Sequence, residues 1–403
     1  MRIKPIKEFN RALTPPPDKS ITIRAVIMGW LSNGTTVIKN PLLSGDTIAA
    51  IDAIGELGAE VSFTQGNLII KGGNFCSGTI DARNSATTMR LLAGAVAGLN
   101  IDVTIKGDAS LSKRNMRSLI AALSDMGAEI ESKNYFPPLT VHGRRLHGID
   151  FTPSSPSAQI KSAVLLAGLN AEGQTTVVEQ IKTRPHTEDM LKSFGADITN
   201  ENGIITLKPS KLTATEINVP GDMSSAAYPI VLGLSKGFCY LKNVGTRRHE
   251  LIEFLLSIGA EIEEEVFGDR ANILVKKSKL KPFTISGALS AALIDELPLL
   301  AVLACTINGE SIIKDAAALK NKECDRIKHT VSNLRNMGAE IVELSDGFKV
   351  NGGSLKGGNV VTQGDHRIAM SMTVGNALSE RGGVVDDDKC VEISYPSFWE
   401  LFL

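Results

Sequence analysis

The polar side chains best suited to catalysis and ligand binding fall in short clusters, and each cluster lies just before an apolar segment. Six of these clusters read DKSITIR (18–24), NSATTMR (84–90), SAQIKSAV (157–164), GDMSSAAY (221–228), IDELP (294–298) and GDHRIAM (364–370). Every cluster contains Ser, Thr or Asp, which cap helix N-termini, and a helix N-terminus attracts anions. The Lys, Arg, His and Gln residues in the same turns are not capping residues. The pattern predicts an anion-binding site built from several helix starts, although a repeat protein that merely repeats its caps is the alternative.

Two further clusters carry more cations. GDASLSKRNMR (107–117) contains Lys113, Arg114 and Arg117, and KNKECDRIK (320–328) places two acids beside Lys322 and Arg326. Guanidinium groups bind carboxylate and phosphate through paired hydrogen bonds, so these positions suit a doubly anionic ligand. The alternative for the second cluster is a solvated helix face with i,i+3 and i,i+4 ion pairs.

The elements that position these clusters repeat along the chain. The phrase Gly-Ala-acid-apolar occurs five times, beginning at 58, 127, 195, 259 and 338. Each copy follows an amphipathic segment that glycine should end, and each precedes two runs with strand-like alternation. This unit predicts a helix followed by a β-hairpin.

Six nearly apolar segments fall between these units. They are AVIMGWL (25–31), MRLLAGAVAGL (89–99), SAVLLAGL (162–169), AAYPIVLGL (226–234), LPLLAVLACTI (297–307) and AMSMTVGNAL (369–378), each followed by a strand. Because they are apolar on every side, they are expected to be buried helices. Six repeats of a sheet plus a buried helix, three per domain, predict two similar α/β domains.

The domain boundaries follow from the repeat count. The sixth repeat lacks the Gly-Ala-acid phrase, and the N-terminal strand MRIKPI is expected to complete it. The chain is expected to cross from one domain to the other at two proline-containing segments, 14–17 and 218–221. The first domain is then discontinuous, 1–13 with 222–403, and the second domain is 14–221. The active site is expected in the cleft between them.

Bulk composition excludes several classes of protein. The chain has 403 residues, a net charge of −1 and 43% hydrophobic residues, which is typical of globular proteins. The balanced charge argues against a broad nucleic-acid footprint. The sequence shows no signal-peptide pattern and no uninterrupted apolar run of membrane-spanning length, so a cytoplasmic, non-membrane protein is expected. The five cysteines form no CxxC pair, so reduced thiols and no structural metal are expected.

The ordered motifs resemble the 5-enolpyruvylshikimate-3-phosphate synthase family over essentially the whole chain. The matching stretches are DKSITIR, NSATTMRLLAG, GDASLSKR, PSAQIKSAVLLAGL, VPGDMSSAAY, IDELPLLAV, KNKECDRI, GDHRIAM and SYPSF. The resemblance implies a two-domain inside-out α/β barrel. It also implies transfer of the enolpyruvyl group of phosphoenolpyruvate to the 5-hydroxyl of shikimate 3-phosphate, with release of phosphate and no cofactor or metal. A monomer is expected, with no nucleic-acid or membrane partner.

The resemblance also implies roles for individual residues. Those expected to hold shikimate 3-phosphate are Lys19, Ser20, Arg24, Ser157, Ala158, Gln159, Thr183, Asp295 and Lys322. Those expected to hold phosphoenolpyruvate are Lys19, Ala86, Arg114, Gln159, Lys322, Arg326 and Arg367. The expected catalytic residues are Lys19, Asp295, which accepts the proton of the 5-hydroxyl, and Glu323, which protonates the methylene carbon.

Some positions depart from the family pattern. The family usually has glycine at the positions of Pro17 and Arg83, histidine at Ile23, proline at Asn115 and lysine at Ile393. It also usually has glycine at Ala86, where the added methyl group is expected to crowd glyphosate, a competitor longer than phosphoenolpyruvate. Relative glyphosate insensitivity is therefore expected.

Three other functions remain as alternatives. The UDP-N-acetylglucosamine enolpyruvyl transferases share fold and chemistry, but they carry Lys-Asn at the first helix and a reactive loop cysteine. Here the first helix has Lys19-Ser20, and no cysteine lies between Cys76 and Cys239. An RNA 3′-phosphate cyclase would need a nucleophilic histidine and a more basic surface. A non-catalytic repeat scaffold would explain the regular spacing of the repeats. It would not explain why Asp295, Glu323 and Arg367 stand at equivalent turns of the repeats.

Overall fold

The computed structural model describes all residues, 1–403, and the chain divides into two compact units. Unit 1 comprises Met1–Pro16 with Pro220–Leu403, and unit 2 comprises Pro17–Val219. The two crossings of the chain therefore fall at Pro16–Pro17 and Val219–Pro220. Each unit has its own hydrophobic core.

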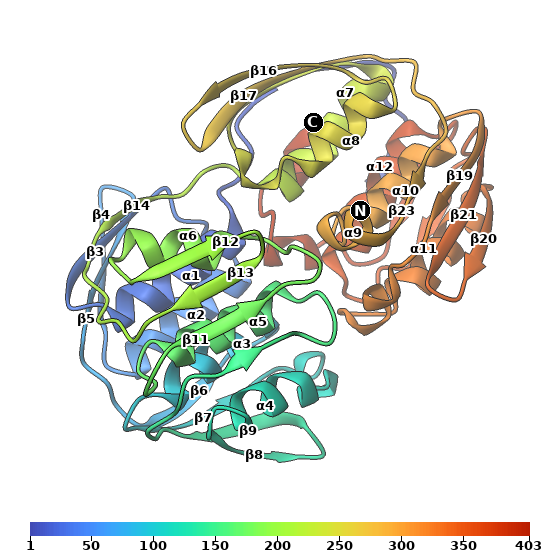
Figure 1. Ribbon diagram of the computed structural model, residues 1–403. Coiled ribbons are helices and arrows are strands. Elements are labelled where there is room, and N and C mark those ends of the chain that lie inside the picture. The colour runs from blue at the N-terminus through green and yellow to red at the C-terminus, as the bar shows by residue number, and fades with distance from the viewer. The chain divides into compact units, whose positions relative to one another are not determined.

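Each unit contains three buried helices, one for each repeat (Figure 1). They are α1 (Lys19–Leu31), α3 (Ala86–Ala97) and α5 (Ala158–Gly168) in unit 2, and α7 (Met223–Lys236), α10 (Leu297–Cys305) and α12 (His366–Leu378) in unit 1. All six coincide with the apolar segments of the sequence, and side chains on every face of them are buried. The prediction of buried rather than surface helices is confirmed.

Six small sheets surround these helices. In unit 2 the strand orders are β14-β3-β5-β4, β6-β7-β9-β8 and β10-β11-β13-β12; in unit 1 they are β2-β15-β17-β16, β18-β19-β21-β20 and β1-β23-β22. The strands of unit 2 are β3 (Gly34–Lys39), β4 (Glu60–Thr64), β5 (Asn67–Gly72), β6 (Gly78–Asp81), β7 (Asp102–Lys106), β8 (Glu129–Lys133), β9 (Phe136–His142), β10 (Asp150–Phe151), β11 (Thr175–Val178), β12 (Ile198–Glu201), β13 (Ile204–Leu207) and β14 (Glu216–Asn218). Those of unit 1 are β1 (Arg2–Ile3), β2 (Phe9–Leu13), β15 (Gly237–Gly245), β16 (Glu261–Phe267), β17 (Arg270–Lys276), β18 (Thr284–Ile285), β19 (Gly309–Ile313), β20 (Glu340–Leu344), β21 (Gly347–Gly352), β22 (Asn359–Val360) and β23 (Gly383–Val385).

The Gly-Ala-acid phrase ends five outer helices: α2 (Gly45–Glu56), α4 (Arg117–Ser124), α6 (His186–Ser193), α8 (Glu250–Ser257) and α11 (Arg326–Asn336). Its five glycines have left-handed backbone angles, for example φ 106° at Gly58. Each alanine amide then donates to the carbonyl five residues earlier, as Ala59 does to Ile54 at 2.9 Å. This hydrogen bond closes the helix and turns the chain into the hairpin.

The sixth sheet is completed by the chain's N-terminus, as the sequence predicted. Arg2 pairs with Val384 and Ile3 with Gly383, in antiparallel register. The second N-terminal strand, β2, adds to another sheet of unit 1 by pairing in parallel with β15. Two segments of the chain more than two hundred residues apart are thereby joined in one unit.

The remaining helical elements are short. They are α9 (Gly287–Ala292) and the 3₁₀ turns η1 (Leu111–Lys113), η2 (Thr246–Arg248), η3 (Ala317–Asn321), η4 (Cys390–Ile393) and η5 (Phe398–Phe402). None of the helices is both long enough and apolar enough to span a bilayer.

The topology explains where the polar clusters lie. In four repeats the buried helix follows the carboxyl end of one strand and returns to a parallel neighbour, as in β6-α3-β7. The strands that follow α1 and α7, β3 and β15, instead pair in parallel with β14 and β2. Between β2 and β15 the chain leaves unit 1 and returns to it. Ligands of open α/β sheets bind at the carboxyl ends of strands, where the helices that follow begin. The fold therefore gathers the helix starts of each unit.

Candidate active site

The predicted site residues divide between the two units. Unit 2 carries Lys19, Ser20, Arg24, Ala86, Arg114, Ser157, Ala158, Gln159 and Thr183. Unit 1 carries Asp295, Lys322, Glu323, Arg326 and Arg367.

Arg24 is the most deeply buried cation of the unit 2 group, with 2% of its surface exposed. Its guanidinium donates to the hydroxyl of Thr187 at 2.7 Å, to the hydroxyl of Ser162 at 2.9 Å and to the carbonyl of Ser20 at 3.0 Å. All three acceptors are neutral, and burial lowers the pKa of Arg24 to about 10. A buried cation held by neutral oxygens is suited to binding an anion.

Lys19 begins α1 and pairs with Asp46, whose carboxylate lies 2.9 Å from the lysine Nζ. Asp46 is in the first turn of α2, and its side chain is only 8% exposed. The carboxylate fixes the direction of the lysine side chain. Sequence reasoning missed Asp46, although its place at a second helix start, after Ser44 and Gly45, could have indicated it.

The starts of α3 and α5 are joined through Gln159. Its amide nitrogen donates to the hydroxyl of Thr87 at 2.8 Å, and its oxygen accepts from Arg90. Ala86 is the first residue of α3 and directly precedes Thr87 in the sequence. Its side chain is buried. The sequence motif contained Arg90, but no role was assigned to it.

The other unit 2 residues have local roles. Ser157 caps α5 by accepting from the amide of Ile160 at 3.3 Å, and Ala158 is the first residue of that helix. Arg114 donates to the side-chain oxygen of Asn84 at 3.4 Å. Thr183 is held by the carboxylate of Glu179.

Arg83 has the left-handed backbone conformation, with φ 51°, that favours glycine. Its guanidinium pairs with Asp52 on the surface of α2 at 2.5 Å. The charge that Arg83 adds to the family pattern is therefore matched locally by a carboxylate.

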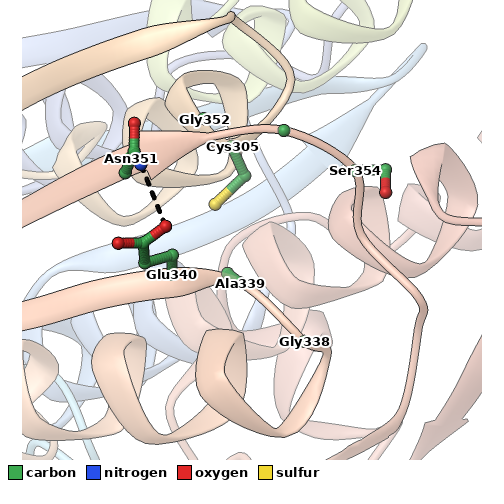
Figure 2. A pocket seen from close by; sticks show the side chains of 8 residues that line it. Cys305, Gly338, Ala339, Glu340, Asn351, Gly352 and Ser354 are labelled. Carbon is green, nitrogen blue, oxygen red and sulfur yellow. Dashed lines mark hydrogen bonds between the residues drawn. The ribbon is translucent and has the colours of Figure 1, made fainter.

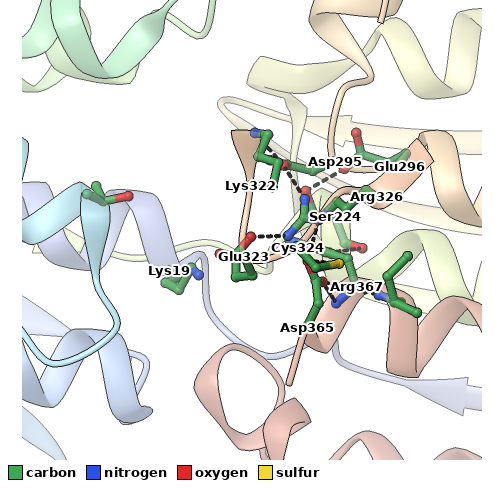
Figure 3. Close-up of polar contacts among 12 residues, drawn as sticks. Lys19, Ser224, Asp295, Glu296, Lys322, Glu323, Cys324, Arg326, Asp365 and Arg367 are labelled. Carbon is green, nitrogen blue, oxygen red and sulfur yellow. Dashed lines mark hydrogen bonds and ion pairs between the residues drawn. The ribbon is translucent and has the colours of Figure 1, made fainter. Parts of the chain in front are cut away.

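In unit 1, a single arginine contacts three carboxylates (Figure 3). Arg326 lies 2.6 Å from Glu323, 2.8 Å from Asp365 and 3.3 Å from Asp295, with 2% of its side chain exposed. Burial acts to lower the pKa of Arg326, but the carboxylates overcome this effect and hold that pKa above its usual value. The interpretation of KNKECDRIK as a solvated helix face is therefore wrong for Arg326. We call these four residues, with Lys322, the Arg326 cluster.

Asp295 does not act as a helix cap. The other five buried helices have capping Asp or Ser side chains, but α10 begins after Glu296 without a side-chain cap. The cap position of α10 is occupied by Glu296, and the preceding residue, Asp295, pairs with Lys322 at 3.4 Å and with Arg326. A carboxylate between two cations is thus placed at a helix start.

Arg367 lies at the start of α12 and points to the start of α7. It donates to the backbone carbonyl of Ser224 at 3.3 Å and to the hydroxyl of Tyr228 at 3.4 Å. Burial acts to lower the pKa of Arg367, and Tyr228 and Asp295 overcome this effect, so that the pKa is raised. Its neighbour Asp365 both caps α12 and binds Arg326.

Beside Asp295, a second buried ion pair was missed by sequence reasoning. Glu296 lies 2.8 Å from Arg248, with side-chain exposures of 1% and 7%. Both residues also contact the hydroxyl of Ser224. The pair joins residues 48 positions apart, which no short motif reveals.

A surface pocket of about 190 Å³ lies elsewhere in unit 1, at the C-terminal end of α10 (Figure 2). It is lined by Cys305, Gly338, Ala339, Glu340, Asn351, Gly352, Gly353 and Ser354. Asn351 donates to Glu340 at 2.9 Å. Because its lining contains a carboxylate and no cation, this pocket is unsuited to anionic substrates.

The comparisons with known proteins cover the whole chain. Residues 3–402 match the family model of EPSP synthase (3-phosphoshikimate 1-carboxyvinyltransferase). The 3-phosphoshikimate 1-carboxyvinyltransferase of Bacillus subtilis is 40% identical, with 99% of this chain and 98% of the relative covered. That of Desulfitobacterium hafniense is 39% identical, with 100% and 96% covered. The solved EPSP synthase of Acinetobacter baumannii matches with a TM-score of 0.85 at 34% identity, with 99% and 96% covered.

The fold and these similarities agree. The chain belongs to the EPSP synthase family of 3-phosphoshikimate 1-carboxyvinyltransferases and is a transferase.

Proposed function

We propose that the protein transfers the enolpyruvyl group of phosphoenolpyruvate to the 5-hydroxyl of shikimate 3-phosphate and releases phosphate. The observation that carries this proposal is the start of α10, where Asp295 lies between Lys322 and Arg326 instead of capping the helix. The reaction needs a carboxylate base among cations that hold two anions. Family membership supports the identity of the substrates.

In the proposed mechanism, Asp295 accepts the proton of the 5-hydroxyl group. The hydroxyl oxygen of shikimate 3-phosphate attacks the second carbon of phosphoenolpyruvate at the same time. Glu323 gives a proton to the methylene carbon, which becomes a methyl group in the tetrahedral adduct. Phosphate then leaves, and the Glu323 carboxylate takes one proton from the methyl group, which restores the double bond. Glu323 lies 2.6 Å from Arg326, a residue that the proposal places against phosphoenolpyruvate.

Substrate binding is proposed to use the residues that the family resemblance assigned. Arg24, Lys19, Ser20, Gln159 and Thr183, with the start of α5, would hold shikimate 3-phosphate together with Asp295 and Lys322 of unit 1. Lys19, Ala86, Arg114 and Gln159 would hold phosphoenolpyruvate with Lys322, Arg326 and Arg367. The neutral partners of Arg24 support an anionic ligand there. A cytoplasmic, monomeric enzyme belongs to the same proposal.

The acceptor distinguishes this function from its nearest alternative. Phosphate release from phosphoenolpyruvate should be rapid with shikimate 3-phosphate and absent with UDP-N-acetylglucosamine. The test is a phosphate assay with each acceptor at matched enzyme and phosphoenolpyruvate concentrations. Release with the nucleotide sugar alone would overturn the proposal, and release with neither acceptor would favour the non-catalytic scaffold.

Relative insensitivity to glyphosate is a finer part of the proposal. Ala86 is buried as the first residue of α3, in the turn assigned to phosphoenolpyruvate. Its methyl group would crowd a longer ligand more than the substrate, at a cost of about 1–3 kcal/mol.

We therefore expect Ala86→Gly to lower the inhibition constant of glyphosate by about tenfold or more, with a smaller change in the KM for phosphoenolpyruvate. Inhibition of both enzymes would be measured at the same ratio of phosphoenolpyruvate to KM. The expectation would be contradicted if glyphosate inhibited the unaltered enzyme tightly and inhibited Ala86→Gly equally tightly.

A further inference from the structure

A buried network of one lysine and two carboxylates joins α5 to α6, and the proposed reaction does not use these three residues. Lys161 is fully buried in α5, and its Nζ lies 3.0 Å from Glu179 and 2.7 Å from Glu188. The side chains of the two carboxylates are 4% and 6% exposed. A third hydrogen bond joins Lys161 to the backbone carbonyl of Arg184 at 3.1 Å.

The two carboxylates differ in what they do with their second oxygen. Glu179 uses Oε2 for Lys161 and Oε1 for Thr183, accepting from both the amide, at 3.1 Å, and the hydroxyl of that residue. Glu188 uses Oε1 for Lys161, while its Oε2 is buried without a hydrogen bond. Glu179 thus links the buried lysine to Thr183, and Glu188 does not.

The segment between β11 and α6 needs such a link. Residues 179–185 form no helix or strand, and Thr183 is only partly buried within them. An irregular segment is held in one conformation by specific contacts rather than by a hydrogen-bonded ladder. The hydrogen bonds of Thr183 to Glu179 span four residues and close this segment into a turn.

We propose that Glu179 is a positioning residue for the acceptor substrate: anchored by Lys161, it fixes Thr183 in the orientation that binds shikimate 3-phosphate. The inference rests on the proposed function, because it concerns Thr183 as a substrate ligand. It assigns no direct contact between Glu179 and the substrate.

The triad offers a matched pair of variants. Glu179→Leu and Glu188→Leu each remove one of two buried carboxylates paired with the same lysine, so a purely structural role predicts similar effects. Positioning predicts that Glu179→Leu raises the KM for shikimate 3-phosphate about tenfold or more. The KM for phosphoenolpyruvate and kcat should stay within about threefold, and Glu188→Leu should leave all three within about threefold.

A conservative variant completes the experiment. Glu179→Gln keeps an oxygen that accepts from Thr183 but loses the one that accepts from Lys161, so it should restore part of the acceptor affinity. Initial rates would be measured on the full chain, with the folded fraction of each variant checked by circular dichroism. Two results would overturn this inference and leave the proposed function intact. One is an equal KM for shikimate 3-phosphate in the two leucine variants. The other is a Glu179→Leu variant in which the KM values for both substrates rise equally. An unaltered enzyme that does not use shikimate 3-phosphate would overturn the proposed function, and this inference with it.

Discussion

The Asp295→Asn enzyme is expected to bind both substrates and to turn over about 10²–10⁴ times more slowly, the usual contribution of a general base. The asparagine keeps the size of the side chain but cannot take the proton of the 5-hydroxyl. Arg326 retains Glu323 and Asp365 as partners, so the cluster should stay folded. The measurement is kcat from phosphate release, with substrate affinity from calorimetry.

The control is an aspartate of the same unit outside the cluster. Asp269 is exposed and lies 3.5 Å from Arg270, so Asp269→Asn should leave kcat unchanged. A near-normal kcat for Asp295→Asn would show that another group takes the proton.

Replacing Lys161 by Met is expected to destabilise unit 2 by about 3–5 kcal/mol, because it leaves two buried carboxylates without their cation. Adding Glu188→Gln to Lys161→Met should recover part of this loss, since one uncompensated charge is removed. Lys208 is the matched control: it is exposed and pairs with Asp197 at 2.9 Å, so Lys208→Met should change stability little.

The positions of the two tryptophans allow unit 2 to be followed by itself. Trp30 lies in unit 2 and is fully buried, whereas Trp399 lies in unit 1. In a Trp399→Phe background, urea unfolding monitored by fluorescence therefore reports on unit 2. An unchanged transition for Lys161→Met would mean that the buried carboxylates have another way to neutralise their charge.

The sequence predicted those features of the fold that local patterns encode. Helices apolar on all sides must be buried, and a Gly-Ala pair that closes a helix by a backbone hydrogen bond leaves a repeated signature, as at Gly58 and Ala59. The pairing of β1 with β23 also followed, because one repeat lacked its hairpin.

The partners of the site residues could not be predicted in the same way. Lys161 lies within an apolar helix, and its carboxylates come 18 and 27 positions later. Arg248 and Glu296 likewise meet only through the packing of unit 1. The same holds for Asp295, whose cationic partners Lys322 and Arg326 come 27 and 31 positions later.

The central claim, transfer of an enolpyruvyl group by addition and elimination, can be tested in one reaction in heavy water. Because Glu323 is proposed to deliver a solvent-derived proton to the methylene carbon, the product should be an enolpyruvyl ether on the 5-oxygen of shikimate 3-phosphate with deuterium in its vinyl methylene group. Proton NMR and mass spectrometry of the isolated product would show both features. An ether without deuterium, or pyruvate and phosphate in place of the ether, would contradict the account.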